Sequence, residues 1–108
     1  MKLNLVDTID DIRVYNIIKN EKNIGSIELI FQDNINTVYI ENVVKDKEYT
    51  GTKLVKEVCE LLRNQYKCNI ACLPLQQYRK YYESLGFKIS LVKDQDVWYT
   101  LDINTQIP

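Results

Sequence analysis

The stretch Thr37–Leu62, TVYIENVVKDKEYTGTKLVKEVCELL, has the pattern of a β-strand, a tight loop and an amphipathic helix. The strand pattern predicts that even-numbered residues from Val38 to Val44 share one face and odd-numbered residues the other. The helix pattern places apolar side chains three and four residues apart, at Leu54, Val55, Val58, Leu61 and Leu62. A helix N-terminus offers free backbone N–H groups and a positive dipole, so the loop Tyr49–Thr52 is a candidate phosphate site.

The composition predicts an ordinary globular protein. A chain of 108 residues is long enough for one hydrophobic core, so we expect a single domain over residues 1–108. The net charge is −1 and no segment concentrates lysine and arginine, which argues against a nucleic-acid partner. The N-terminus lacks a signal-peptide pattern and no apolar run reaches the length of a membrane span. We therefore expect a cytoplasmic protein without a membrane segment.

The histidine and cysteine content narrows the possible chemistry. The chain has no histidine, the commonest metal ligand and the usual base for a Ser or Cys nucleophile. Cys68 and Cys72 lie on one expected strand, roughly 13 Å apart, which is too far for both to ligate one metal ion. With Cys59 the cysteines are odd in number, so we expect reduced thiols, with Cys72 structural rather than nucleophilic. A hydrolase triad and a metal site are both disfavoured.

The remaining chain supplies strands on both sides of the opening stretch. Two segments have helical patterns, at residues 52–66 and 76–85, and Gly86 is placed to end the second. Besides 37–44, strand patterns occupy residues 1–6, 12–19, 25–31, 67–73, 87–92 and 97–103. Short polar turns join the first strands into an antiparallel meander, and a helical crossover makes 67–73 parallel to 37–44. The fold class is therefore α+β, with a mixed, mostly antiparallel sheet of about six to seven strands and two main helices.

This order of elements, together with two local motifs, resembles the GNAT superfamily of acetyl-CoA-dependent N-acetyltransferases. Residues 82–87, YESLGF, are similar to the family's Leu-Tyr-Glu-Lys-Leu-Gly-Phe element on its last helix. Residues 39–49, YIENVVKDKEY, are similar to the strand and turn before the family's coenzyme loop. The resemblance covers roughly residues 12–103. It implies a GNAT-like fold, but Val6 and Ile12 are too close together to hold the family's usual first two helices.

The coenzyme loop departs from the family pattern. That pattern is Arg or Gln, two residues, Gly, one residue, then Gly or Ala, and its amides cradle pyrophosphate. Aligned without a gap, Thr50 replaces the Arg or Gln, and Lys53 and Val55 replace the glycines. A deletion of about four residues after Gly51 aligns the following helix better. Either alignment damages the cradle, because glycines let backbone amides approach phosphate closely. We expect a lower affinity for coenzyme A.

The resemblance also implies a cosubstrate, an acceptor and a set of site residues. The cosubstrate is acetyl-CoA, and the acceptor is a primary amine, either an exposed lysine or N-terminus of a protein or a small amine. Tyr82 matches the tyrosine that protonates the leaving thiolate, and Glu41 resembles a carboxylate that serves as a base. The implied coenzyme contacts are Val43, Val44, Thr50, Gly51, Thr52, Lys53 and Leu73.

Each of these assignments has a simpler alternative. The tyrosines at 78, 81 and 82 also fit a stripe that packs against the core, and Glu41 also fits a solvated strand position. The damaged loop supports a second function, a non-catalytic GNAT-like module that has lost coenzyme A and binds a protein partner. The strands at 39–44 and 69–73 distinguish the two functions. Strands that part favour the enzyme, and strands that stay paired favour the module.

Overall fold

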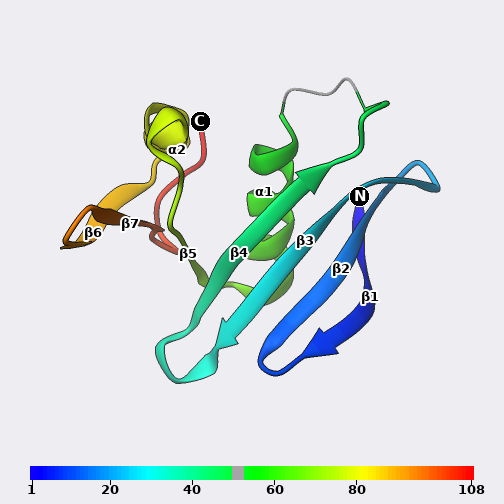
Figure 1. Cartoon of the computed structure of the whole chain (residues 1–108), viewed down its shortest axis with the longest axis horizontal. Helices are drawn as coiled ribbons and strands as arrows, with labels where there is room; N and C mark the ends of the chain where they lie inside the picture. Colours follow the sequence, from blue (N-terminus) through cyan, green and yellow to red (C-terminus); the bar gives the residue numbers. More distant parts are fainter. Residues whose placement is uncertain (50–52) are drawn as a thin grey trace.

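The computed structural model describes residues 1–49 and 53–108, so Thr50, Gly51 and Thr52 lie outside the described residues. In the described residues, seven strands form one sheet in the order β1-β2-β3-β4-β5-β7-β6 (Figure 1). The strands are β1 (Lys2–Ile9), β2 (Ile12–Lys19), β3 (Lys22–Gln32), β4 (Thr37–Lys45), β5 (Asn69–Cys72), β6 (Lys88–Lys93) and β7 (Asp96–Leu101). Only the β4–β5 pair is parallel among them. The expected mostly antiparallel sheet is confirmed, although β1 is longer and β5 shorter than predicted.

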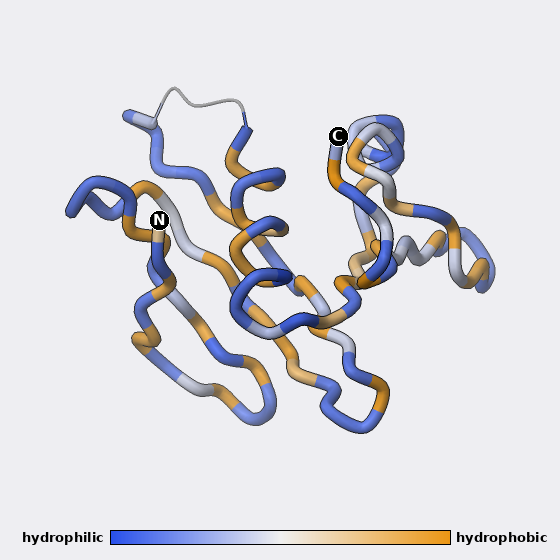
Figure 2. The backbone as a smooth tube through the Cα atoms, turned by 180° about the vertical axis from the view of Figure 1, so that it is seen from behind, coloured by the Kyte–Doolittle hydropathy of each residue, from blue (hydrophilic) through white to orange (hydrophobic). Residues whose placement is uncertain are grey.

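Helix α1 (Leu54–Tyr66) covers one face of the sheet. It lies behind β4 in Figure 1 and in front of the strands in Figure 2, where hydrophobic positions recur along it. Its side chains Leu54, Val58 and Leu62 are buried, as expected from their helical spacing, and Cys59, which was not among the predicted positions, is buried beside them. They share a core with Tyr15, Ile17, Ile27 and Leu29 of β2 and β3. In the described part of the chain, no helix is long and apolar enough to cross a membrane.

On the opposite face of the sheet lie the residues that alternate with the buried ones along each strand. They pair with one another across neighbouring strands. Val14, Glu28 and Asn42 form one such row, because Val14 pairs with Glu28 and Glu28 with Asn42. We call this side of the sheet the open face. Figure 1 looks onto it, and no helix of the described chain crosses in front of β1 to β4 there. The absence of helices between β1 and β2 leaves this side uncovered.

A β-bulge at Glu41 changes the side-chain pattern of β4. Leu29 of β3 pairs with Ile40, yet the preceding residue of β3, Glu28, pairs with Asn42, so Glu41 is an extra residue. The extra residue moves Val43 onto the α1 side with Ile40. It also leaves Val44 on the open face, 51% exposed. The uninterrupted alternation that the sequence predicts from Val38 to Val44 is therefore wrong beyond Ile40.

The second predicted helix is divided in two. A 3-10 turn, Gln76–Tyr78, leads into α2 (Arg79–Ser84), and Gly86 follows at a φ of 102°. The backbone N–H of Gly86 donates a hydrogen bond to the carbonyl of Glu83 (3.0 Å). A Cβ at this position would approach Thr105 Cγ2 at 3.0 Å and Leu101 Cδ1 at 3.3 Å. Glycine is therefore required here for both conformation and space.

Replacing Gly86 by alanine is expected to destabilise the protein by about 1–2 kcal/mol, because alanine is strained at positive φ. Urea denaturation followed by circular dichroism measures the loss. Lys80→Ala, at an exposed position of α2, is the control and is expected to change stability by no more than about 0.5 kcal/mol. An unchanged midpoint for Gly86→Ala would contradict this account of the end of α2.

Candidate functional site

The site begins where β4 and β5 part. Their parallel ladder runs from Thr37 and Asn69 to Ile40 and Cys72, while β4 continues to Lys45. In the described residues, β4 from Glu41 onward has β3 on one edge and no strand on the other. The backbone groups on that free edge need water or a ligand as partners. We call the space beyond Ile40 and Cys72 the gap.

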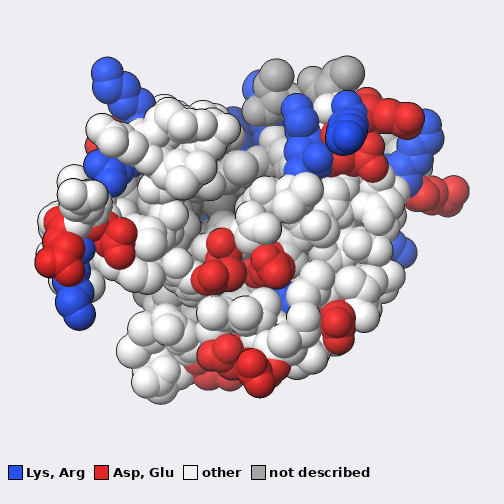
Figure 3. All heavy atoms as spheres, viewed as in Figure 1, with Lys and Arg blue, Asp and Glu red and all other residues white. Residues whose placement is uncertain are grey.

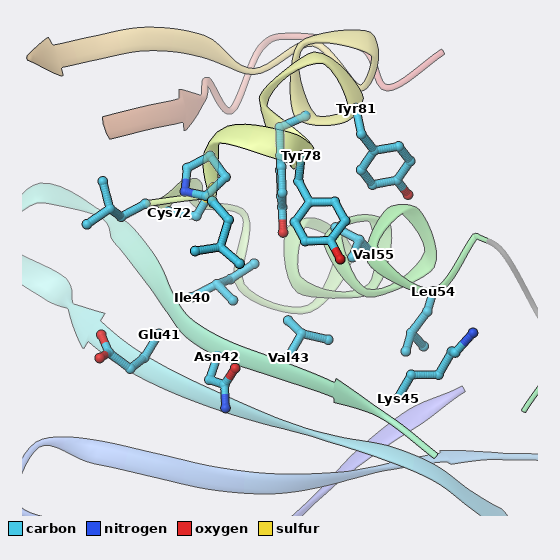
Figure 4. Close-up of a pocket in the computed structure, with 14 residues that line it drawn as sticks. Ile40, Glu41, Asn42, Val43, Lys45, Leu54, Val55, Cys72, Tyr78 and Tyr81 are labelled. Atoms are coloured by element: carbon cyan, nitrogen blue, oxygen red, sulfur yellow. The ribbon is translucent and has the colours of Figure 1, made fainter. Parts of the chain in front are cut away.

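A pocket of about 780 Å³ occupies the gap (Figure 4). That volume is in the range of small-molecule and cofactor sites. Four parts of the chain converge on it: β4, the end of β5 with the segment after it, the first turn of α1, and the tyrosines at and after the 3-10 turn. The lining residues are Ile40, Glu41, Asn42, Val43, Lys45, Leu54, Val55, Cys72, Leu73, Pro74, Leu75, Tyr78, Tyr81 and Tyr82.

One end of the pocket favours an anion. Leu54 and Val55 place the first turn of α1 at the pocket, where N–H groups without an intrahelical partner and the helix dipole carry partial positive charge. Lys45 lines the same end. Where β4 ends, Figure 3 shows basic side chains beside acidic ones. The acidic residue of this first turn, Glu57, is bound by Lys19 of β2 at 3.0 Å. Its charge is thereby largely compensated.

Tyr82 enters the pocket from α2 with its ring held on two sides. The ring meets Phe87 edge-on at 5.3 Å between centroids and Tyr81 at 5.7 Å. Burial, followed by the neighbouring thiols of Cys72 and Cys59, raises the pKa of the Tyr82 phenol well above its ordinary value. The phenol therefore keeps its proton at physiological pH.

Cys72 lies at the end of β5 and is not suited to nucleophilic chemistry. Its side chain is buried, and burial raises the pKa of the thiol to about 12. The reactive form of cysteine is the thiolate, which is scarce at that pKa. All three cysteines are free and buried. The interpretation of Cys72 as a structural thiol agrees with this burial.

Four of the predicted site residues come together around the pocket: Glu41, Val43, Leu73 and Tyr82. Glu41 is exposed at the bulge and projects with Asn42 to the side of β4 opposite Ile40 and Val43 (Figure 4). Val44, on the open face, and Lys53, exposed before α1, do not line the pocket. The predicted contacts Thr50, Gly51 and Thr52 lie outside the described residues.

Several lining residues were not predicted from the sequence. Leu54 and Val55 have the spacing of core positions, and only the parting of β4 from β5 brings them to the pocket. Tyr78 and Tyr81 were recognised as a stripe at helical spacing, which was the available signal. Lys45 lies at the end of a strand pattern, and its sequence position gave no signal of a pocket.

No protein-family model matches this sequence, and no curated protein does either. Solved structures do match the arrangement of its elements. The chain has the GNAT fold. A GNAT family acetyltransferase from Elizabethkingia anophelis, with acetyl-CoA bound, is 16% identical with a TM-score of 0.59, and the match covers 85% of this chain and 76% of that one. At such identities the likeness concerns the fold.

Two further structures with the GNAT fold give the same result. Tetrahymena GCN5 has a TM-score of 0.70 at 11% identity, with 89% of this chain and 71% of that chain covered. The aminoglycoside 6'-N-acetyltransferase from Enterococcus faecium has a TM-score of 0.63 at 13% identity, with 93% and 79% covered. The expected fold class, a GNAT-like sheet with two main helices and none between β1 and β2, is confirmed.

Proposed function

We propose that this chain is an N-acetyltransferase that moves the acetyl group of acetyl-CoA to a primary amine. The observation that carries the proposal is the gap between β4 and β5 with its pocket. The free edge of β4 offers backbone partners for the amides of an extended pantetheine arm. Lys45 and the first turn of α1 offer positive charge for its phosphates. The acetyl-CoA bound to the Elizabethkingia anophelis acetyltransferase, which shares this fold, supports the choice of cosubstrate.

The residues around the pocket suit acyl transfer. The amine nitrogen attacks the thioester carbonyl carbon, so a C–N bond forms, the C–S bond breaks and the sulfur leaves with the bonding electron pair. The neutral phenol of Tyr82 holds the proton that the leaving sulfur needs. Glu41, exposed at the bulge, accepts the proton that the amine must lose, directly or through one water molecule. Tyr82 is proposed as the acid and Glu41 as the base.

Equilibrium binding of acetyl-CoA tests the proposal. Ligand at a hundred times its dissociation constant is expected to stabilise the fold by about 2.7 kcal/mol and to raise Tm by several degrees. Calorimetry and a thermal-shift assay measure both effects. Val43→Glu places a carboxylate on the α1 side, in the pocket, and is expected to weaken binding by about tenfold through charge repulsion. Val44→Glu, its neighbour on the open face, is the matched control and is expected to leave affinity within about twofold.

A failure of acetyl-CoA to bind at millimolar concentration would remove the enzyme proposal. The remaining function is then the non-catalytic GNAT-like module that binds a protein partner. If Val43→Glu and Val44→Glu instead changed the affinity for acetyl-CoA equally, the coenzyme would bind this chain at a place other than the gap.

A further inference from the structure

An aromatic pair lies on the open face beside the gap. Tyr39 of β4 pairs in register with Ala71 of β5, and its ring lies 5.4 Å from that of Trp98, at an interplanar angle of 44°. Trp98 faces this side because its neighbour Tyr99 is buried on the other side, where its hydroxyl donates to Glu83 of α2 (3.2 Å). Ala71 belongs to β5, which lies between β4 and β7. Its small side chain lets the rings of Tyr39 and Trp98 approach each other across β5.

Two carboxylates, Glu41 (Figure 4) and Asp96, lie on the same side of the sheet as this pair. Glu41 lines the pocket, and Asp96 precedes Trp98 by two residues on β7, which places both on the same side of that strand. Burial raises the pKa of the Tyr39 phenol to about 12, and negative charge, that of Glu41 first, adds to the rise. In the described residues neither carboxylate has a basic partner within 4.0 Å. Lys93, opposite Asp96 in the β6–β7 register, is exposed.

The two ends of the gap therefore differ in charge. Lys45 and the N-terminus of α1 make one end positive. Glu41 and, on the neighbouring strand β3, Glu28 make the open-face side negative. Figure 3, which looks onto this face, shows acidic side chains below the hollow, and both basic and acidic ones at the top, where β4 ends. One ligand of uniform charge does not suit both ends.

We propose that Tyr39, Trp98 and Glu41 bind a cationic acceptor, an alkylammonium group at the end of a flexible chain, on the open face. The faces of tyrosine and tryptophan rings attract a cation within about 6 Å of their centroids. The Glu41 carboxylate supplies a charge-assisted hydrogen bond to the ammonium. The role of this cation as an acetyl acceptor rests on the proposed function, but its binding does not.

Tryptophan fluorescence measures this binding directly, because Trp98 is the only tryptophan in the chain. The probe is N-acetyl-lysine methylamide and its neutral isostere is N-acetyl-norleucine methylamide, each titrated without acetyl-CoA. We expect a saturable change with the lysine compound and an affinity at least about tenfold lower for the isostere. Tyr39→Leu and Glu41→Gln are expected to weaken lysine-probe binding by roughly three- to tenfold.

Two variants serve as controls. Tyr39→Phe keeps the aromatic face, and Glu60→Gln removes an exposed charge on α1, on the other side of the sheet, so both are expected to stay within about twofold of the wild type. If Tyr39→Leu unfolds, as its melting curve would show, Glu41→Gln and the neutral isostere still test the site. Equal affinity for the two probes, no saturable change, or an unaffected Glu41→Gln variant would overturn the proposal. If the lysine probe binds and acetyl-CoA does not, this cation site is supported and the proposed acetyltransferase function is removed. If acetyl-CoA binds and the lysine probe does not, the proposed function is supported and this cation site is removed.

Discussion

Replacing Phe87 by alanine is expected to lower the free energy of unfolding by about 3–5 kcal/mol. Phe87 is 2% exposed and stands among the largest fully buried side chains. Its ring packs edge-on against Tyr82 and joins the segment after α2 to the common core. Alanine would leave a cavity there as well as losing the buried apolar area. The loss is a large part of the total stability of about 5–15 kcal/mol that a domain has, so urea denaturation should show a greatly lowered midpoint.

Two controls separate this cavity effect from a general sensitivity of the C-terminal segment. Phe87→Leu keeps most of the apolar volume and is expected to cost clearly less than alanine. Ile89→Ala removes a side chain that is 56% exposed on β6 and is expected to change stability by no more than about 0.5 kcal/mol. A loss for Ile89→Ala as large as that for Phe87→Ala would contradict the burial argument.

The sequence predicted those elements whose pattern is local. Strand β2 begins and ends at Ile12 and Lys19 as predicted, because β-branched residues there alternate between faces and turn residues follow. The buried positions Leu54, Val58 and Leu62 of α1 follow from helical spacing alone. Gly86 ends α2 at a positive φ, a conformation that the glycine itself indicates.

The side-chain pattern of β4 was not predictable in this way. A bulge depends on how two strands align with each other, and the residues of β4 alone continue to alternate past Glu41. This one extra residue decides that Val43 lines the pocket and that Val44 does not. A single non-local feature therefore takes Val44, one of the expected coenzyme contacts, out of the pocket lining.

The candidate site was predictable where a motif marks it. Tyr82 and Leu73 were named through the resemblance to the GNAT superfamily, and both line the pocket. The Tyr39–Trp98 pair had no such signal, since it exists only because β5 and β7 are neighbours in the sheet. The charge difference between the two ends of the gap likewise arises from strand order and from the parting of β4 and β5.

Replacing Tyr82 by phenylalanine is expected to lower kcat for acetyl transfer to a primary amine by about a hundredfold or more. The ring and its contacts with Phe87 and Tyr81 remain, so only the proton donor is lost. The affinity for acetyl-CoA is therefore expected to stay within about twofold of the wild type, because the interactions that bind the ground state and the transition state equally are retained. Release of the coenzyme thiol measures kcat, and calorimetry measures the affinity.

Tyr81→Phe is the matched control, because Tyr81 also lines the pocket from α2 and its phenol pKa is also raised by burial. Its kcat is expected to change by less than about threefold, since no proton transfer is assigned to it. The pH dependence adds a second check. Because its pKa is raised, the Tyr82 hydroxyl stays protonated up to a higher pH than an ordinary tyrosine. Deprotonation of Tyr82 is therefore not expected to lower wild-type kcat below about pH 10. If Tyr82→Phe turns over like the wild type, or if Tyr81→Phe loses as much activity, Tyr82 is not the acid, and its partly buried ring serves only to pack α2 against the core.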